Sequence, residues 1–279
     1  MIHEILFLTD GSPFSHYAFT YAEQIATANH ARVVLVQVIQ DPILIDQYQI
    51  VPAETYQELL DLGTASATLN IDRLSTRLAA AGVSTSSEIL RGNPAAALLA
   101  LEAKEHPDLV VMSSHGRTGL TRFALGSVAD RLVREGTAPV LLVKTNDPDR
   151  RLRSALLMLD GSAVAEAALP VVENLAGRPI KVVKLLRTLE DITEWDQAKN
   201  YLADVAVRLE KTGLLTELIL RVSDPAVIAS VESTDVDLVV LATHGRGGFE
   251  RFRYGSVAEQ ILHEVDRPIL LVRAAKATE

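Results

Sequence analysis

The chain of 279 residues is 48% hydrophobic, carries a formal net charge of −9 at pH 7 and contains no cysteine. This length accommodates two domains of about 140 residues each, and the hydrophobic content excludes a disordered protein. The acidic balance excludes a protein that coats nucleic acid, which needs a surplus of Lys and Arg, and the lack of cysteine excludes disulfides and thiolate metal sites.

The N-terminal residues lead directly into a strand-like segment, without the basic region and the long apolar core of a signal peptide. No apolar run approaches the roughly 20 residues that span a bilayer. We therefore expect a cytoplasmic protein that has neither nucleic acid nor a membrane as a partner.

Strand-like and helical segments alternate in the first half of the chain. Short runs of β-branched residues and leucine predict strands at Ile5–Leu8, Val33–Val38, Thr85–Leu90, Leu109–Met112 and Val140–Val143. Apolar periodicity between them predicts helices at Ser15–Ala28, Tyr56–Ala81, Pro94–Lys104 and Ser127–Glu135. This alternation predicts an α/β domain with a doubly wound, five-stranded parallel sheet. The stretch Asp41–Ala53 is either a lid or interface segment or a surface loop.

The second half of the chain repeats the first. Residues 108–143 and 237–272 align without a gap and are identical at 19 of 36 positions, and a D-G-S segment recurs at Asp10 and Asp160. In the second half, Ile180–Leu186 and Glu217–Leu220 are predicted as the second and third strands. A repeat of this length indicates duplication of a whole domain. We predict domains at residues 1–146 and 151–275, joined by a polar linker.

Two recurring segments follow strands in each half. Asp10 begins the turn after the first strand, and Gly116 and Gly126 lie in the loop after the fourth, with Gly245 and Gly255 as their repeats. Open α/β sheets bind ligands beyond the carboxyl ends of their strands, where the strand order reverses. Glycine lets an anion approach the backbone amides, and the helix that follows presents free N–H groups and a positive dipole end. The pattern therefore predicts a phosphate-binding site in each half.

Several nearby side chains allow structural interpretations as well. Asp10 and Asp160 fit hydrogen bonding to a ribose and also an Asx turn before the first helix, and these roles are compatible. Ser127 with Asp130, like its repeat in the second half, matches a capping box. His115 has no second ligand at metal-binding spacing, so we interpret it as stabilising the loop.

The combination of motifs resembles one known family. It consists of the pattern G-x2-G-x9-G-[ST], with Ser113 or Ala242 at its first position, the D-G-S turn, the G-x-P-A segment at Gly92 and a closing P-V-L-L-V strand. Together these resemble universal stress proteins over nearly the whole chain, twice. The resemblance implies the strand order 3-2-1-4-5 in each domain and a fold like that of adenine nucleotide alpha hydrolases. It also implies ATP, with or without Mg²⁺, as the cofactor.

The resemblance further implies how the domains associate and which residues bind the nucleotide. The fifth strands, Pro139–Val143 and Pro268–Val272, are expected to pair as an internal pseudo-dimer, and the whole chain could form a homodimer. The first-half site is implied at Thr9, Asp10, Val38, Met112, Ser113, Gly116, Gly126, Ser127 and Val128. The second-half site is implied at Leu159, Asp160, Leu185, Leu241, Ala242, Gly245, Gly255, Ser256 and Val257.

The two sites differ in sequence. Thr9 is replaced by Leu159, and Gly92 by Ser223 beside Asp224, an acid that would repel phosphate. We therefore expect the first half to bind more tightly. The chain has no G-x4-G-K-[ST] motif and no residue poised as a general base. The sequence thus predicts an ATP-binding stress protein with a regulatory role and at most weak hydrolysis. The alternatives are a nucleotide-free interaction protein of the same fold and a slow ATPase.

Overall fold

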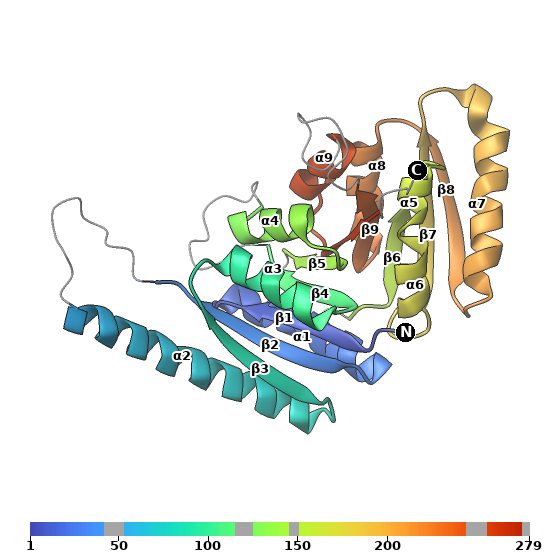
Figure 1. Cartoon of the computed structure of the whole chain (residues 1–279). Helices are drawn as coiled ribbons and strands as arrows, with labels where there is room; N and C mark the ends of the chain where they lie inside the picture. The colour runs from blue at the N-terminus through green and yellow to red at the C-terminus, as the bar shows by residue number, and fades with distance from the viewer. Residues whose placement is uncertain (42–52, 115–124, 145–150, 244–255, 275–279) are drawn as a thin grey trace.

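The computed structural model describes residues 1–41, 53–114, 125–144, 151–243 and 256–274. Within these residues ten strands form one sheet, in the order β3-β2-β1-β4-β5-β10-β9-β6-β7-β8 (Figure 1). Strand neighbours within each half are parallel, and only the central pair, β5 with β10, is antiparallel. Each half therefore has the strand order 3-2-1-4-5, which confirms the predicted fold class.

The first domain follows the predicted alternation closely. Its elements are β1 (Glu4–Thr9), α1 (Pro13–Asn29), β2 (Arg32–Ile39), α2 (Ala53–Ala80), β3 (Thr85–Arg91), α3 (Pro94–Glu105), β4 (Leu109–Ser113), α4 (Ser127–Glu135) and β5 (Val140–Val143). Side chains of Ser12 and Asn93 cap α1 and α3, and a proline follows each cap at the first helical position.

The second domain repeats this order with a broken first helix. Its elements are β6 (Ser154–Met158), α5 (Ala163–Glu166), α6 (Leu169–Leu175), β7 (Val182–Leu189), η1 (Ile192–Glu194), α7 (Trp195–Glu210), β8 (Leu215–Val222), α8 (Pro225–Glu232), η2 (Ser233–Asp235), β9 (Leu238–Thr243), α9 (Ser256–Glu264) and β10 (Ile269–Arg273). The break between α5 and α6 precedes Pro170, which has no N–H to continue the helix.

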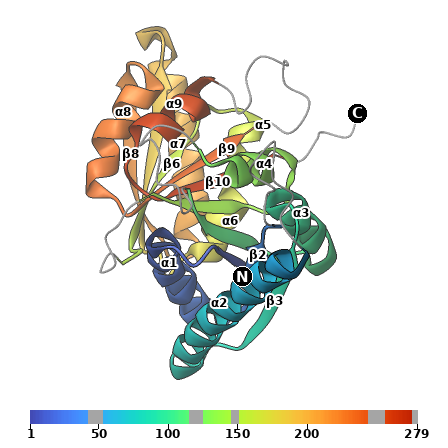
Figure 2. The same ribbon diagram turned by 90° about the vertical axis from the view of Figure 1, so that its left-hand side faces the viewer.

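Helices cover both faces of the sheet. In the first domain α3 and α4 lie on one face and α1 and α2 on the other (Figure 1), and Figure 2 shows α8 beside α9 in the second domain. Alternate strand residues therefore enter different cores: Ile5 and Phe7 pack with α1 and α2, whereas Leu6 and Leu8 pack with α3 and α4. Both cores continue through the second domain.

The two halves join through their fifth strands. Leu141 pairs with Leu270 and Leu142 with Ile269 in the antiparallel ladder between β5 and β10. The first pair belongs to the core under α1 and the second to the core under α4. Because β5 and β10 cover each other's edges, neither leaves an unpaired row of backbone groups. The apolar P-V-L-L-V and P-I-L-L-V segments thus form the centre of one extended sheet.

None of the helices in the part of the chain described here is both long and apolar enough to cross a membrane.

Candidate functional site

The turn after the first strand of each domain is built by its aspartate and serine. In the second domain Asp160 Oδ1 accepts a hydrogen bond from the Ser162 amide at 2.8 Å, and Ser162 Oγ accepts one from the Ala165 amide at 3.1 Å. Asp10 and Ser12 make the same pair of contacts in the first domain. Both aspartates therefore adopt the Asx-turn geometry that the sequence allowed.

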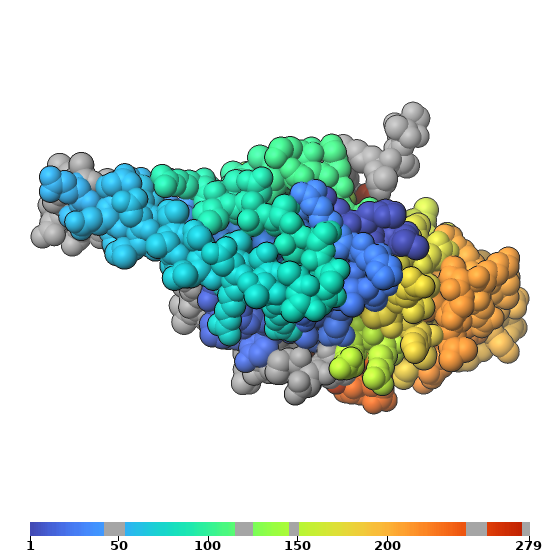
Figure 3. Space-filling model, turned by 90° about the horizontal axis from the view of Figure 1, so that it is seen from below, coloured from blue at the N-terminus to red at the C-terminus, as the bar shows by residue number. Residues whose placement is uncertain are grey.

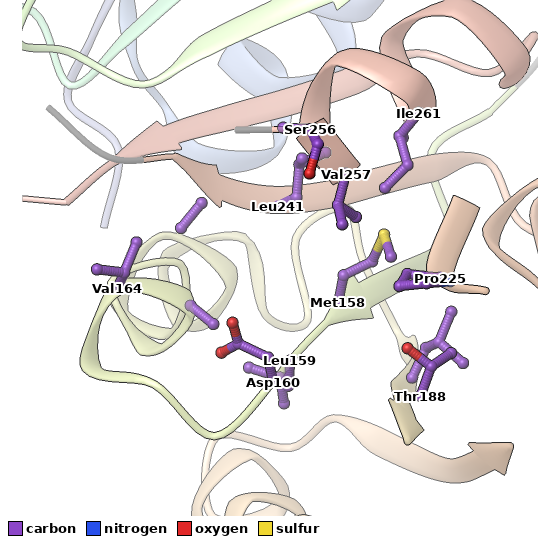
Figure 4. Close-up of a pocket in the computed structure, with 14 residues that line it drawn as sticks. Met158, Leu159, Asp160, Val164, Thr188, Pro225, Leu241, Ser256, Val257 and Ile261 are labelled. Atoms are coloured by element: carbon purple, nitrogen blue, oxygen red, sulfur yellow. The ribbon is translucent and has the colours of Figure 1, made fainter. Parts of the chain in front are cut away.

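The second domain contains a cavity of about 300 Å³ at the carboxyl ends of its central strands. Figure 4 shows residues that follow β6 on one side and the start of α9, with Ser256 and Val257, on another. The cavity is lined by Met158, Leu159, Asp160, Val164, Ala165, Leu186, Thr188, Pro225, Leu241, Ala242, Ser256, Val257, Ala258 and Ile261. It therefore lies where open α/β sheets bind ligands.

The start of α9 brings polar backbone groups to this cavity. The helix begins at Ser256, and both Ser256 and Val257 line the cavity. The amides of a first helical turn have no partner within the helix, and they carry the positive end of the helix dipole. Asp160 is the one charged side chain among the lining residues. The cavity thus combines a hydrogen-bond acceptor, an anion-compatible helix start and a largely apolar wall.

The predicted first-domain residues gather at the corresponding place. Met112 and Ser113 end β4, and Gly126 precedes α4, where its amide donates to the Ser114 carbonyl at 3.0 Å. A Cβ at Gly126 would lie 3.0 Å from that same carbonyl oxygen, so the close approach favours glycine. Ser127 is exposed and Val128 is half-buried at the start of the helix.

The predicted capping role of Ser127 is wrong. The helix α4 begins at Ser127, so Gly126 occupies the N-cap position and no side chain caps the helix there. A serine caps only from the residue before the helix, because its backbone must be non-helical to turn its hydroxyl back to the first amides. The first turn of α4 is therefore left without a side-chain cap.

The placement of Leu185 at the site is also wrong. Leu185 is fully buried in the core on the opposite side of the sheet, whereas Leu186 and Thr188 line the cavity. The strand β7 continues to Leu189, three residues beyond the predicted end. Thr188 is the equivalent of Val38. Thr188 follows Asp160 by 28 positions, as Val38 follows Asp10, and β7 pairs with β6 in the same register as β2 with β1.

Sequence reasoning missed eight of the lining residues. They are Met158, Val164, Ala165, Leu186, Thr188, Pro225, Ala258 and Ile261. Strand alternation would have indicated Met158, which lies on the same sheet face as Leu156. Pro225 could have been found from its repeat, since Asn93-Pro94 and Asp224-Pro225 begin equivalent helices.

Several predicted residues lie outside the described part of the chain. They are Gly116, Gly245, Gly255, His115 and most of the stretch Asp41–Ala53. Elsewhere in the chain, among the residues that the structure describes, no three His, Asp or Glu side chains are grouped as a metal site would require.

Beneath the turn, the two domains carry different polar groups. In the first domain Asn70 Nδ2 donates to Thr9 Oγ1 at 3.2 Å and to Gln37 Oε1 at 2.8 Å. In the second domain strand register replaces Gln37 with Arg187, whose guanidinium lies 5.2 Å from the ring centre of Tyr201. Burial raises the pKa of the Tyr201 hydroxyl, and nearby Glu166 raises it further. The first domain thus has a neutral hydrogen-bond network at the place where the second domain has a cation stacked on an aromatic ring.

One protein-family model matches the sequence of both halves of the chain. The model of the "Universal stress protein family" matches residues 1–144 and again residues 152–273. The chain belongs to the universal stress protein family. The two matches fall on the two halves of the sheet, so this universal stress protein carries the family domain twice.

Some members of the family match this universal stress protein over nearly its whole length, and others match about half of it. Universal stress protein Slr1230 from Synechocystis is 25% identical, and the alignment covers 96% of this chain and 99% of that one. The crystal structure of a universal stress protein from Archaeoglobus fulgidus superposes with a TM-score of 0.76 at 17% identity, covering 97% of this chain and 98% of that one. A universal stress protein solved in complex with cAMP is 25% identical, with a TM-score of 0.39, and covers 51% of this chain and 97% of its own.

Proposed function

We propose that this universal stress protein binds ATP in each domain and that occupancy of the sites regulates its associations, with at most slow hydrolysis. The observation that carries the proposal is the second-domain cavity, in which Asp160 and the start of α9 face a shared space. Its volume of about 300 Å³ lies at the lower end of the range for small-molecule sites, about 300–1,000 Å³.

The lining suggests how each part of the nucleotide would be held. Met158, Pro225 and Ile261 offer apolar surface to a base. Asp160 uses Oδ1 for the turn, and a carboxylate has further lone pairs with which to accept from ribose hydroxyls. The amides of the first turn of α9, which begins at Ser256 and has no intrahelical acceptors for them, would bind the phosphates. Of these residues, the sequence motifs had indicated Asp160, Ser256 and Val257 but not the three apolar ones.

Asp224, which was expected to weaken phosphate binding at the second site, is hydrogen-bonded to backbone amides. Asp224 caps α8, and its Oδ1 accepts hydrogen bonds from the amides of Ala226 and Val227 at 2.9 and 3.1 Å. Two amide donors partly balance its charge, so its repulsion of phosphate is weaker than the sequence alone suggests. We still expect tighter binding by the first domain, where the buried Thr9 hydroxyl accepts hydrogen bonds from Gly11 and Asn70 and so fixes the turn; Leu159 has no such hydroxyl.

Regulation follows from the architecture rather than from chemistry at the site. The chain has no Walker A lysine to polarise a γ-phosphate. This absence supports a protein that binds ATP without hydrolysing it rapidly. The domains share both cores and the β5–β10 ladder. We propose that this internal pair is the functional unit, in which a nucleotide in one domain is sensed by the other.

Calorimetric titration with ATP tests the proposal. The wild-type protein should bind two equivalents, and Val257→Trp, at a 39% exposed position of the cavity wall, should remove the weaker one. Val231→Trp, at a 59% exposed position of α8 outside the lining, is the matched control and should bind like wild type. Absence of binding at millimolar ATP, or unchanged binding by Val257→Trp, would overturn the proposal.

The ribose contact has its own test. Asp160→Asn keeps the acceptor that the turn needs but removes the charged acceptor for a ribose. Wild-type protein should bind ATP about tenfold more tightly than an analogue lacking one ribose hydroxyl, a difference of about 1.4 kcal/mol. That preference should shrink at the second site in Asp160→Asn, and an unchanged preference would exclude the contact.

A further inference from the structure

The helix α2 has an exposed apolar face that the first domain does not use. Leu59, Leu62 and Leu69 are 45%, 67% and 72% exposed. On an α-helix, positions 59, 62, 66 and 69 fall within one arc of about 80°, at 100° per residue. The opposite face carries Leu60 and Ala67, which are buried against β2 and β3. The exposed leucines are therefore a second, separate face, which we call the α2 stripe (Leu59, Leu62, Leu69).

The second domain provides an internal comparison. Val33 in β2 corresponds to Val183 in β7, and these two residues pair with Thr85 in β3 and Thr216 in β8. Thr85 and Thr216 are 131 positions apart. Because α2 and α7 lead directly into β3 and β8, we align the two helices with the same difference of 131 residues. The position of Leu69 is then Asn200 in α7, and that of Ser66 is Gln197. The helix α7 begins at Trp195, so the first three turns of α2, which carry Leu59 and Leu62, have no counterpart. The apolar face is thus an addition to the first domain and is not required by the fold.

The location of α2 leaves this face accessible. The helix lies on the side of the first domain away from the second domain, and its N-terminal end extends past the rest of the fold (Figures 1 and 3). The exposed positions run from Thr55 to Thr76, about 30 Å of helix at 1.5 Å per residue. A face of this length can accommodate another helix along its side.

The sequence of the face is complementary to itself in the antiparallel direction. If two copies of α2 cross at a two-fold axis between Ala65 and Ser66, Leu62 of one copy meets Leu69 of the other. The same axis brings Glu58 of one copy to Arg73 of the other. Glu58 and Arg73 are both exposed, and neither makes an ion pair with another described residue. Two leucine contacts and two opposite-charge pairs therefore form by one symmetry operation.

The centre of the face favours close packing. Ala65 and Ser66 are small and exposed, so the helix axes can approach to about 8 Å, the lower end of the usual range. Larger apolar residues follow on both sides, and the charged residues lie at the ends. This is the arrangement of an interface with an apolar centre and a polar rim.

From this complementarity we infer that the α2 stripe is the docking surface for a second copy of the chain, with the two α2 helices packed antiparallel about Ala65 and Ser66. The inference is independent of nucleotide binding. Because α2 lies on the side of the first domain away from the second domain, the second-domain cavity of each copy would lie away from the contact.

Sedimentation velocity of the full chain tests this interface. Wild type should sediment as a dimer of twice 30.3 kDa, and Leu62→Glu/Leu69→Glu should sediment as a monomer with an unchanged circular dichroism spectrum. Leu215→Glu is the matched control, since Leu215 is a 68% exposed leucine on β8, and it should stay dimeric. A monomeric wild type, or a dimeric double variant, would overturn the inference.

Two further variants test the geometry. Glu58→Arg and Arg73→Glu should each weaken the dimer at least tenfold, and the double swap should restore it. Because the chain has no cysteine, Ser66→Cys should form a disulfide-linked dimer under oxidation, whereas Ala79→Cys, exposed near the end of the same helix, should not. Crosslinking of both variants alike, or no rescue by the swap, would exclude the antiparallel register.

Discussion

Lys144, which follows β5 in the first domain, donates hydrogen bonds to the carbonyl oxygens of Leu262 and Val265 at the end of α9 in the second. Arg273 at the end of β10 makes the equivalent contact in return, to the carbonyl of Gly136 at the end of α4. A cation at a helix C-terminus satisfies free carbonyls and the negative end of the helix dipole. Each domain thus supports, in the other, the helix whose start faces the proposed nucleotide site.

Removal of this contact should destabilise the chain. In Lys144→Met the carbonyls of Leu262 and Val265 lose their donor, and the cost of unsatisfied buried acceptors is about 1–3 kcal/mol. We expect the free energy of unfolding, measured in urea, to fall by about that amount. Lys104→Met is the control: its side chain is 67% exposed, and exposed ion pairs such as its contacts with Glu88 and Glu105 contribute little to stability. Equal effects of the two substitutions would contradict the capping role.

The same lysine should give stability a distinctive pH dependence. Burial lowers the pKa of Lys144 from 10.5 to about 8, although Asp266 opposes the shift. Between these two values the unfolded chain binds more protons than the folded one, so the free energy of unfolding rises with pH. The difference in stability between wild type and Lys144→Met should therefore increase in favour of wild type from pH 8 to 10.5. A flat difference across this window would show that the lysine is not buried.

A side chain at Gly161 should destabilise the second domain. Its φ is +86°, and a Cβ there would lie 2.9 Å from Arg187 Nη1. Alanine should lower the free energy of unfolding by about 1–2 kcal/mol for the left-handed backbone alone, and more for the contact with Arg187. Gly177→Ala is the control, because Gly177 has φ +69° and open space around its Cα. Arg187→Gln, which introduces the residue found at Gln37, should bring the cost of Gly161→Ala down to that of the control.

The amino-acid sequence was sufficient to predict the duplication, the order of the main helices and strands, and the strands beside the candidate site. Repeated motifs, turn residues and runs of apolar strand residues are local signals, and they identify β1, β4 and their repeats without knowledge of distant contacts. The Asx turns at Asp10 and Asp160 are equally local, because each aspartate binds an amide two residues away.

Only the tertiary structure decided which side chains meet. Leu185 and Leu186 are adjacent apolar residues, but the register of β7 beside β6 turns Leu186 to the cavity and Leu185 to the opposite core. Ser127 matches a capping box in sequence, but the helix begins at Ser127 itself, so Gly126 occupies the N-cap position. The contacts of Lys144 and Arg273 join residues more than 115 positions apart. No local pattern encodes such pairs, because they exist only when β5 and β10 align the two domains.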